Sequence, residues 1–189
     1  MSANQVRIIA GRHRGRRLHF LPGRGLRPTP DRVRETVFNW LQGEVSGARC
    51  LDLFAGSGAL GLEALSRGAG HLCAVEQNRL AAQRLRDNIA QLHEESAAEV
   101  VQVDALRLLK IPPEAPFDIV FLDPPFADAL LPAVCGLLEQ HGWLAPEALL
   151  YLEQDASHPW PVLPANWIPY REGLAGQSKH RLVRRSIPG

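Results

Sequence analysis

The stretch "LDLFAGSGALGLEALSRGA", residues 51–69, determines more of the expected fold than any other part of the chain. An apolar run interrupted by Asp52 comes first, three glycines follow, and a second apolar run ends at Gly68. Glycines allow unusual backbone dihedrals and a close approach to a ligand, and a helix N-terminus offers free N–H groups. The stretch therefore predicts a strand, a glycine-rich turn that binds a nucleotide-like ligand, and a helix.

Strand-like and helix-like segments alternate on both sides of this stretch. We expect strands at residues 48–54, 71–76, 99–104, 117–123 and 148–154, and helices at residues 59–68, 78–93 and 129–140. The last of these helices contains an internal proline. Residues 167–173 and 179–186 are separated only by "LAGQS" and predict an antiparallel hairpin that closes the sheet. Strands separated by helices indicate an α/β fold with a mainly parallel sheet covered on both faces.

The N-terminal residues predict a small basic element in front of this fold. Residues 6–21 hold two short strand-like runs around the turn "RHRG", which predicts a hairpin. A connection rich in proline and glycine follows, and Asp31 is expected to cap a helix that continues to about Gly43. We therefore divide the chain into a basic β-hairpin extension, residues 1–30, and one domain, residues 31–189.

The net charge of +1 hides a strong asymmetry along the chain. Residues 1–34 contain nine arginines and one aspartate, a net charge of +8, whereas residues 35–170 carry −11 and residues 171–189 carry +4. Arginine is the only cation in the first block, and its planar fork suits phosphates and base edges. The positive charge at the two ends of the chain therefore predicts contact with a polyanion, although a solvated arm that only aids solubility would have the same composition.

Several functional classes are disfavoured by composition. The apolar runs fall short of the roughly 18 residues of a membrane span, and the N-terminus lacks the apolar core of a secretory signal. We expect a soluble, cytoplasmic protein. The three cysteines are isolated from one another and the seven histidines lack the spacing of a helical metal site, so no disulfide and no metal are predicted.

The glycine-rich turn also matches the dinucleotide-binding pattern Gly56-x-Gly58-x-x-Gly61, and Glu76 lies twenty residues beyond Gly56. A hydride-transfer enzyme is therefore an alternative. Two features disfavour it: Asp52 would crowd a cofactor pyrophosphate, and a small-substrate dehydrogenase has no role for a basic hairpin.

The string D-x-F-x-G-x-G after a strand resembles the first motif of class I S-adenosylmethionine-dependent methyltransferases. This resemblance implies a seven-stranded, Rossmann-like sheet with an antiparallel C-terminal hairpin, and S-adenosyl-L-methionine as cofactor. It also implies that Glu76 accepts hydrogen bonds from the ribose hydroxyls and that Asp104 and Ala105 meet the adenine edge. The implied cofactor-binding residues are Asp52, Phe54, Ala55, Gly56, Gly58, Glu76, Gln77, Asp104, Ala105 and Asp123.

The segment "FLDPPF", residues 121–126, is similar to the Asp/Asn-Pro-Pro-aromatic motif of methyltransferases that modify exocyclic amines of nucleobases. Such an amine is a poor nucleophile because its lone pair is delocalised into the ring. Asp123 and the carbonyl of Pro124 can accept the amine hydrogens, Pro125 stiffens the turn, and Phe126 can stack on a base rotated out of its helix. With an ordinary pKa, Asp123 would be ionised at neutral pH. These four residues are the predicted catalytic set. The sequence contains no Pro-Cys pair, the feature that would suggest a covalent route, so we expect direct in-line transfer of the methyl group.

The two motifs do not distinguish guanine N2 from adenine N6, or RNA from DNA. The segments "RIIAGRHRGRRL" (7–18) and "RPTPDRVRETVFNWL" (27–41) resemble the N-terminal signature of the RsmD family of bacterial 16S rRNA (guanine-N2)-methyltransferases. This resemblance implies a guanine in 16S ribosomal RNA as substrate, within an assembled or partly assembled small subunit, and we expect a monomer. An adenine-N6 methyltransferase acting on DNA or RNA, and a protein that only binds RNA, are the alternatives. The expected RNA-binding residues are Arg12, Arg14, Arg16, Arg17, Arg27, Thr29 and Arg32.

Overall fold

The computed structural model of the chain describes residues 4–23, 28–125 and 129–187. Five helices and nine strands are found in these residues. The helices are α1 (Asp31–Trp40), α2 (Ala59–Ser66), α3 (Arg79–Gln91), α4 (Ala105–Leu108) and α5 (Leu131–Gln140). The strands are β1 (Gln5–Arg7), β2 (Arg17–His19), β3 (Arg49–Asp52), β4 (His71–Val75), β5 (Ala98–Val101), β6 (Phe117–Leu122), β7 (Leu144–Asp155), β8 (Trp167–Ala175) and β9 (Ser178–Arg185).

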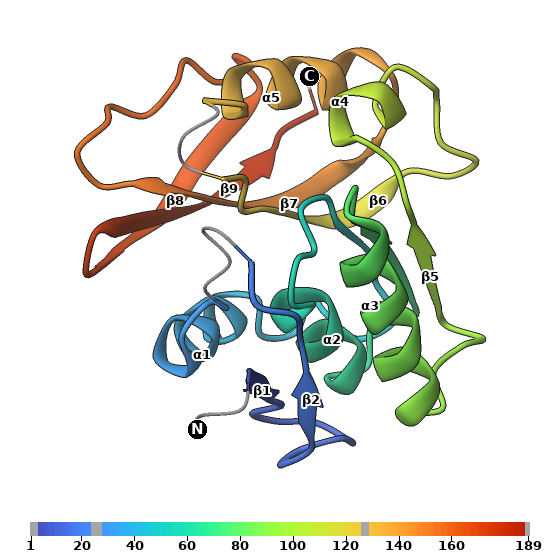
Figure 1. Cartoon of the computed structure of the whole chain (residues 1–189). Helices are drawn as coiled ribbons and strands as arrows, with labels where there is room; N and C mark the ends of the chain where they lie inside the picture. Colours follow the sequence, from blue (N-terminus) through green and yellow to red (C-terminus); the bar gives the residue numbers. More distant parts are fainter. Residues whose placement is uncertain (1–3, 24–27, 126–128, 188–189) are drawn as a thin grey trace.

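Seven strands form one sheet in the order β5-β4-β3-β6-β7-β9-β8; five of them, β5 to β9, are labelled in Figure 1. The pairs from β5 to β7 are parallel, and β9 is antiparallel to both β7 and β8. The last strand is therefore inserted between β7 and β8, which leaves β8 at the edge. The predicted class I fold, with a mainly parallel sheet and an antiparallel C-terminal hairpin, is confirmed.

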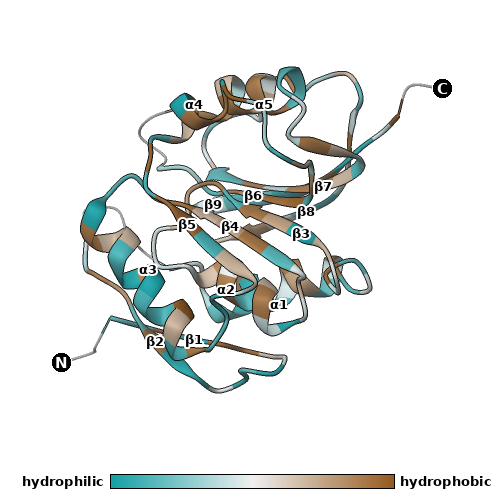
Figure 2. Cartoon of the chain, turned by 90° about the vertical axis from the view of Figure 1, so that its right-hand side faces the viewer, coloured by the Kyte–Doolittle hydropathy of each residue, from teal (hydrophilic) through white to brown (hydrophobic). Residues whose placement is uncertain are grey.

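Helices cover both faces of this sheet. In Figure 1, α1, α2 and α3 lie below the sheet, and α4 and α5 lie above it. Two clusters of buried apolar side chains correspond to the two layers: one contains Phe38 and Leu85, and the other contains Leu109 and Val134. In Figure 2 the central strands are largely hydrophobic, which is expected for strands buried on both faces.

The parallel strands place the expected ligand-binding acids at one edge of the sheet. Asp52 ends β3, Glu76 follows β4, and Asp123 follows β6. Because the carboxyl ends of parallel strands meet at the same edge, side chains far apart in the sequence converge there. The β3–β6 register, which pairs Asp52 with Phe121, brings the glycine-rich turn next to the "DPP" segment.

The N-terminal hairpin packs against helices and not against the large sheet. Strands β1 and β2 pair antiparallel, and Ile8 and Leu18 join the buried cluster formed with α2 and α3. The amide of Asn88 in α3 donates to the carbonyl of His19 at 2.8 Å. The expected hairpin is confirmed, and the division of the chain at residue 30 stays a prediction.

Three details differ from the expectations. Pro132 lies in the first turn of α5 and not inside the helix, where its missing N–H and fixed φ are tolerated. Asp31 is the first residue of α1 and does not cap it; its carboxylate contacts Arg34 and Arg7 instead. Helix α4 was not expected, because four residues are too few to produce a helical period.

The longest described helix, α3, has 13 residues. No described helix is long and apolar enough to span a membrane.

Candidate active site

A cavity of about 1350 Å³ opens at the carboxyl edge of the sheet. Its lining includes the ends of β3, β4 and β6, the start of α4, the β8–β9 turn and part of the N-terminal segment. Eleven of the predicted cofactor-binding and catalytic residues line this one cavity: Asp52, Phe54, Ala55, Gly56, Glu76, Gln77, Asp104, Ala105, Asp123, Pro124 and Pro125. Residues predicted from separate motifs therefore share one space.

Gly58 does not line the cavity but shapes the turn beside it. It precedes α2 with φ of 80°, a left-handed conformation that favours glycine. A Cβ atom at this position would lie 2.5 Å from the Leu85 side chain. The second glycine of the motif is therefore required by backbone conformation and helix packing.

Asp52 is a buried carboxyl group held by the turn that follows it. Its Oδ2 accepts a hydrogen bond from the N–H of Gly61 at 3.0 Å. Burial raises the pKa of Asp52 to about 7; nearby Glu76 adds to the rise, and hydrogen bonds from the N–H groups of Gly61 and Phe54 oppose it. At neutral pH the group is thus close to half protonated, and a cationic ligand beside it would favour its ionised form.

Glu76 is fixed at the end of β4 by two backbone donors. Oε2 accepts from the N–H of Gly56 at 3.0 Å, and Oε1 accepts from the N–H of Asn78 at 2.8 Å. Each oxygen keeps a second lone pair. The carboxylate is therefore preorganised to accept two further hydrogen bonds, as a pair of vicinal hydroxyls would donate.

Asp104 caps the short helix α4 through a bond from the N–H of Arg107 to its Oδ1, at 3.0 Å. Ala105, the first residue of α4, is buried at the cavity wall. The unexpected helix α4 thus provides the rim at which an adenine edge was predicted to bind.

Asp123 lies in the cavity at the end of β6, in surroundings that change its acidity. Burial raises the pKa of Asp123 well above its ordinary value, the charges of Glu153 and Asp52 raise it further, and the Thr29 hydroxyl partly opposes them. The condition of an ordinary pKa, under which Asp123 would be ionised at neutral pH, is therefore not met, because the folded chain buries Asp123 beside two other carboxyl groups. A protonated carboxyl group still accepts through its carbonyl oxygen.

Glu153 is a cavity residue that sequence reasoning missed. It lies in β7, is 7% exposed, and accepts hydrogen bonds from Tyr151 at 2.7 Å and Ser178 at 2.6 Å. One signal was available in the sequence: Glu153 is an acid near the end of the fifth expected strand, as Asp52 and Asp123 are for theirs.

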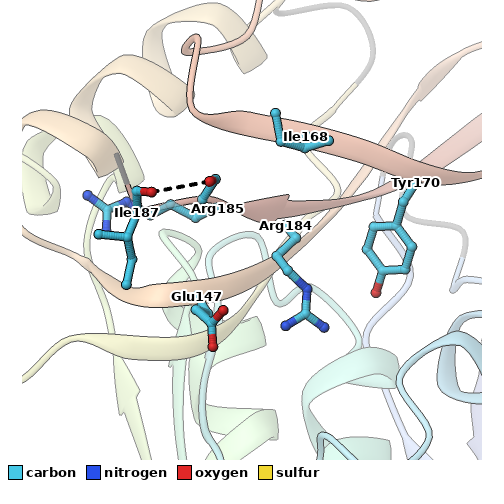
Figure 3. A pocket seen from close by; sticks show the side chains of 7 residues that line it. Glu147, Ile168, Tyr170, Arg184, Arg185 and Ile187 are labelled. Atoms are coloured by element: carbon cyan, nitrogen blue, oxygen red, sulfur yellow. Dashed lines mark hydrogen bonds between the residues drawn. The ribbon is translucent and has the colours of Figure 1, made fainter. Parts of the chain in front are cut away.

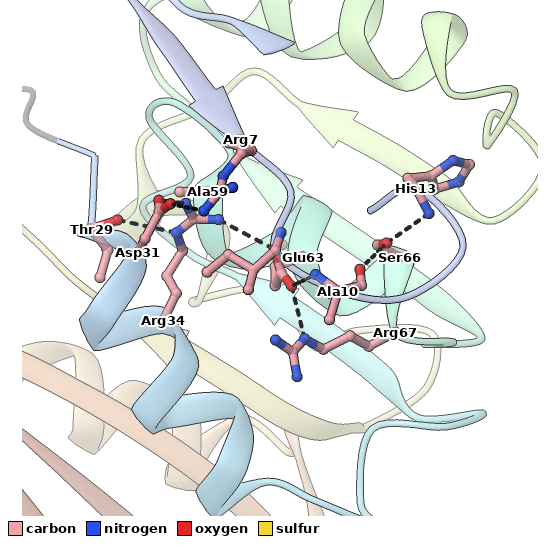
Figure 4. A network of polar contacts seen from close by, with 12 residues as sticks. Arg7, Ala10, His13, Thr29, Asp31, Arg34, Ala59, Glu63, Ser66 and Arg67 are labelled. Carbon is pink, nitrogen blue, oxygen red and sulfur yellow. Dashed lines mark hydrogen bonds and ion pairs between the residues drawn. The ribbon is translucent and has the colours of Figure 1, made fainter. Parts of the chain in front are cut away.

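The N-terminal segment forms part of the cavity wall through residues that include Pro28, Thr29 and Val33. A buried polar network holds this wall in place (Figure 4). The guanidinium of Arg34 donates to the carbonyl of Thr29 at 3.1 Å and to Glu63 at 3.2 Å. Glu63 in α2 is fully buried and also accepts from the N–H groups of Ile9 and Ala10. The same network therefore anchors the hairpin, α1 and the cavity wall.

The basic residues expected to bind RNA fall into two groups. Arg12 is paired with Glu94, with 2.6 Å between Nε and Oε1, and Arg16 donates to the carbonyl of Gln91 at 3.1 Å. Arg14, Arg17 and Arg32 are exposed and form no ion pair within the described ranges. Of the remaining predicted site residues, Arg27 and Phe126 lie outside the described residues.

A second, smaller cavity of about 460 Å³ lies on the C-terminal strands (Figure 3). Glu147, Ile168, Tyr170 and the neighbouring arginines line it. It contains no predicted site residue, and its arginines are already paired: Arg184 with Glu44 and Arg185 with Glu139. Within the described part of the chain, no cluster of three His, Cys, Asp or Glu residues could hold a metal ion.

Comparison with known proteins identifies relatives over almost the whole chain. The profile of the family described as "Conserved hypothetical protein 95" matches residues 6–184. "Ribosomal RNA small subunit methyltransferase D" of Escherichia coli strain K12 is 49% identical over 187 residues, covering 99% of this chain and 93% of that protein. The protein of the same name from Haemophilus influenzae is 46% identical over 182 residues, covering 95% and 94%. The solved structure of Escherichia coli yhhF has a TM-score of 0.91 at 47% identity and covers 97% of this chain and 99% of that one.

Proposed function

This chain belongs to the RsmD family, whose profile carries the description "Conserved hypothetical protein 95", and we propose that it methylates N2 of a guanine in 16S ribosomal RNA. The resemblance read from its motifs is confirmed, and the chain is a methyltransferase of small-subunit ribosomal RNA. One observation supports the finer proposal above all: Asp123 and Pro124 line the same cavity as the glycine-rich turn and the strand-end acids.

The methyl donor in this proposal is S-adenosyl-L-methionine. When bound, it supplies a methyl group on a sulfonium centre whose S–C bond breaks with the electrons left on sulfur. The residues present suit this donor. An ammonium group beside Asp52 would favour the ionised form of that carboxyl group, and Glu76 keeps two lone pairs that can accept hydrogen bonds from ribose hydroxyls. Asp104 and Ala105 at the start of α4 would hold the adenine, and Phe54, Ala55, Gly56 and Gln77 complete the wall.

The "DPP" segment would hold the substrate amine. The Asp123 side chain and the Pro124 carbonyl accept its two hydrogens, which draws the nitrogen towards tetrahedral geometry and frees its lone pair. The nitrogen then forms the new N–C bond and releases one proton to water. Fixed acceptors in a buried site stabilise the developing charge without reorganisation, so positioning and hydrogen bonding account for catalysis. Pro125 stiffens the segment.

The RNA would approach from the side of the N-terminal hairpin. Arg14, Arg17 and Arg32 are exposed and suited to phosphates, whereas Arg12 and Arg16 would have to leave partners within the chain. Thr29 lines the cavity beside Asp123, so the segment after the hairpin would contact the base. We propose that the chain acts as a monomer, in the cytoplasm, on an assembled or partly assembled small subunit, and that Arg27 and Phe126 contribute to RNA binding and base stacking.

The decisive experiment is mass mapping of methylated nucleosides in ribosomal RNA from cells with and without this protein. We expect one N2-methylguanine in 16S RNA to be lost without the protein and restored by purified chain with S-adenosyl-L-methionine. Loss of an N6-methyladenine instead would support the adenine alternative. An unchanged 16S RNA would contradict the proposed substrate.

A further inference from the structure

Glu153 is a buried carboxylate next to Asp123 to which the reaction described above assigns no role. Strand β7 pairs in parallel with β6, and the register matches Leu122 with Leu152. The next residues, Asp123 just after β6 and Glu153 within β7, therefore lie at the same level along the two chains, with their backbones about 4.8 Å apart along the hydrogen-bonding direction. Both line the large cavity. Two carboxyl groups thus face one space.

Two hydroxyl groups fix the orientation of Glu153. The Tyr151 hydroxyl donates to Oε2 at 2.7 Å, and the Ser178 hydroxyl donates to Oε1 at 2.6 Å. Burial and the charges of Glu153 and Asp123 raise the pKa of Tyr151 well above its ordinary value, so this hydroxyl stays a donor. Each Glu153 oxygen keeps one lone pair that can accept a further hydrogen bond.

Strand order indicates which part of the cavity Glu153 faces. Apart from Asp123, which follows β6, the proposed cofactor residues end or follow β3, β4 and β5, whereas Glu153 lies in β7, on the other side of β6. A base whose amine meets Asp123 must therefore extend away from the cofactor, over β6 and β7. Ser178 and the β8–β9 turn form the wall at this end.

We propose that Glu153 accepts the N1–H of the target guanine and so determines the choice of base. This assignment rests on the proposed function. Guanine presents two adjacent donors, the C2 amine and N1–H, which match carboxyl groups on two adjacent strands. In adenine the amine lies next to N1, and this N1 is a hydrogen-bond acceptor. A Glu153 carboxylate facing N1 would place two acceptors against each other with no proton between them. A buried acceptor left without a donor is costly, so the pair selects guanine by matching one base and opposing the other.

The test uses a base that differs from guanine in this respect. 2,6-Diaminopurine keeps the C2 amine, carries a lone pair at N1 in place of N–H, and has an amine in place of the C6 carbonyl oxygen, so the change of preference in the Glu153 variant isolates the N1 contact. Small subunits are assembled with 16S RNA that has either guanine or 2,6-diaminopurine at the mapped position, and kcat/KM is measured for both. We expect the wild-type chain to favour guanine by about 30-fold or more, a size typical for one mismatched buried hydrogen bond. Glu153→Gln, whose amide can donate to N1, should reduce the preference to about threefold or less.

Comparing two substrates on one preparation removes any effect of a variant's folded fraction. Tyr151→Phe is the matched control: it removes a donor to Glu153 but keeps the carboxylate, so its preference for guanine should remain. Equilibrium binding of both subunits in the presence of S-adenosylhomocysteine should give the same order. Equal wild-type rates on the two bases, or an unchanged ratio in Glu153→Gln, would overturn the role of Glu153. Failure of the wild-type chain to methylate guanine would instead contradict the proposed function.

Discussion

At the scale of single residues, the chemistry of a side chain in this cavity depends on the carboxyl groups around it. Asp52, Asp123 and Glu153 come from three adjacent strands, and burial raises the pKa of Asp52 and the pKa of Asp123. Asp123 consequently has a raised pKa, with Glu153 and Asp52 contributing to the rise. The Asp123 side chain provides a hydrogen-bond acceptor, and the burial and the carboxyl groups around it determine whether that side chain is protonated.

Replacing Asp123 tests its role in holding the amine. We expect Asp123→Ala to reduce methyl transfer by about 100-fold or more, a size typical for the loss of one preorganised hydrogen-bonding group. S-adenosylhomocysteine binding, followed by calorimetry, should change little. Asp123→Asn is the control, since its amide oxygen can still accept one amine hydrogen, and it should retain more activity than the alanine variant. Full activity of Asp123→Ala would refute the proposed role.

Asp52 makes stability depend on pH. Its pKa is about 7 in the folded chain and 3.8 as the ordinary value, so between these pH values the folded chain keeps a proton that the unfolded chain has lost. The free energy of unfolding should therefore fall as pH rises through this window, by up to about 4 kcal/mol from this group. In Asp52→Asn the decline should be smaller by this contribution, while Asp123, whose pKa is also raised, still contributes to it. Urea unfolding of both proteins at pH 5 and pH 7.5 measures the difference. Equal pH dependence in both proteins would argue against a raised pKa.

At the scale of elements, the buried acid Glu63 connects three pieces of the chain. It lies in α2 and accepts hydrogen bonds from the hairpin backbone, from Arg34 of α1 and from Arg67. Arg34 in turn holds the carbonyl of Thr29, whose hydroxyl is close to Asp123. The N-terminal elements therefore reach the cavity through one polar network, and the position of the cavity wall depends on it.

Neutralising Glu63 should destabilise this arrangement. In Glu63→Gln the buried guanidinium of Arg34 loses its charged partner in α2, and we expect the free energy of unfolding to fall by about 3 kcal/mol. Glu44→Gln is the matched control because the Glu44–Arg184 pair is exposed and should contribute less than about 1 kcal/mol. Urea unfolding of the three proteins measures both effects. Equal losses in the two variants would show that burial of the Glu63 pair has no special importance.

At the scale of the whole molecule, positive charge is concentrated at the two ends of the chain, while the middle is acidic. Strands β1 and β2 of the hairpin lie below α2 in Figure 1, and Arg14 and Arg17 of the hairpin are exposed. Residues 28–33 then extend from the hairpin region into the cavity wall. One surface for phosphates and one cavity for a base are thus connected by the segment that contains Thr29.

This arrangement predicts that RNA binding and cofactor binding can be separated. The double variant Arg14→Ala, Arg17→Ala should weaken binding to ribosomal RNA and lower the dependence of log K on log salt by about two, because each arginine neutralises one phosphate. Affinity for S-adenosylhomocysteine should not change. Lys110→Ala, an exposed cation in the acidic middle of the chain, is the control and should leave both affinities unaltered. An unchanged salt dependence in the double variant would exclude these arginines from phosphate contact.

Much of the fold could be predicted from local patterns. The long helices and the strands have apolar periods that are independent of distant residues, and the glycine-rich turn requires backbone conformations that glycine favours, as at Gly58. The four-residue helix α4 was missed because it is shorter than any such period. The acids Asp52, Glu76, Asp104 and Asp123 were identified because each follows or ends a strand, and parallel strands end at one edge.

The sequence by itself therefore determined the α/β class, the edge of the sheet that binds ligands and the identity of the groups placed there. Only the tertiary structure decided which groups meet: Thr29, Asp123 and Glu153 are far apart along the chain and face one cavity once β6 and β7 pair and α1 packs below the sheet. It also decided the acidity of Asp123. The physical reason is that periodicity and turn chemistry act over a few neighbouring residues, whereas desolvation and coulombic coupling depend on what the folded chain brings within a few ångströms.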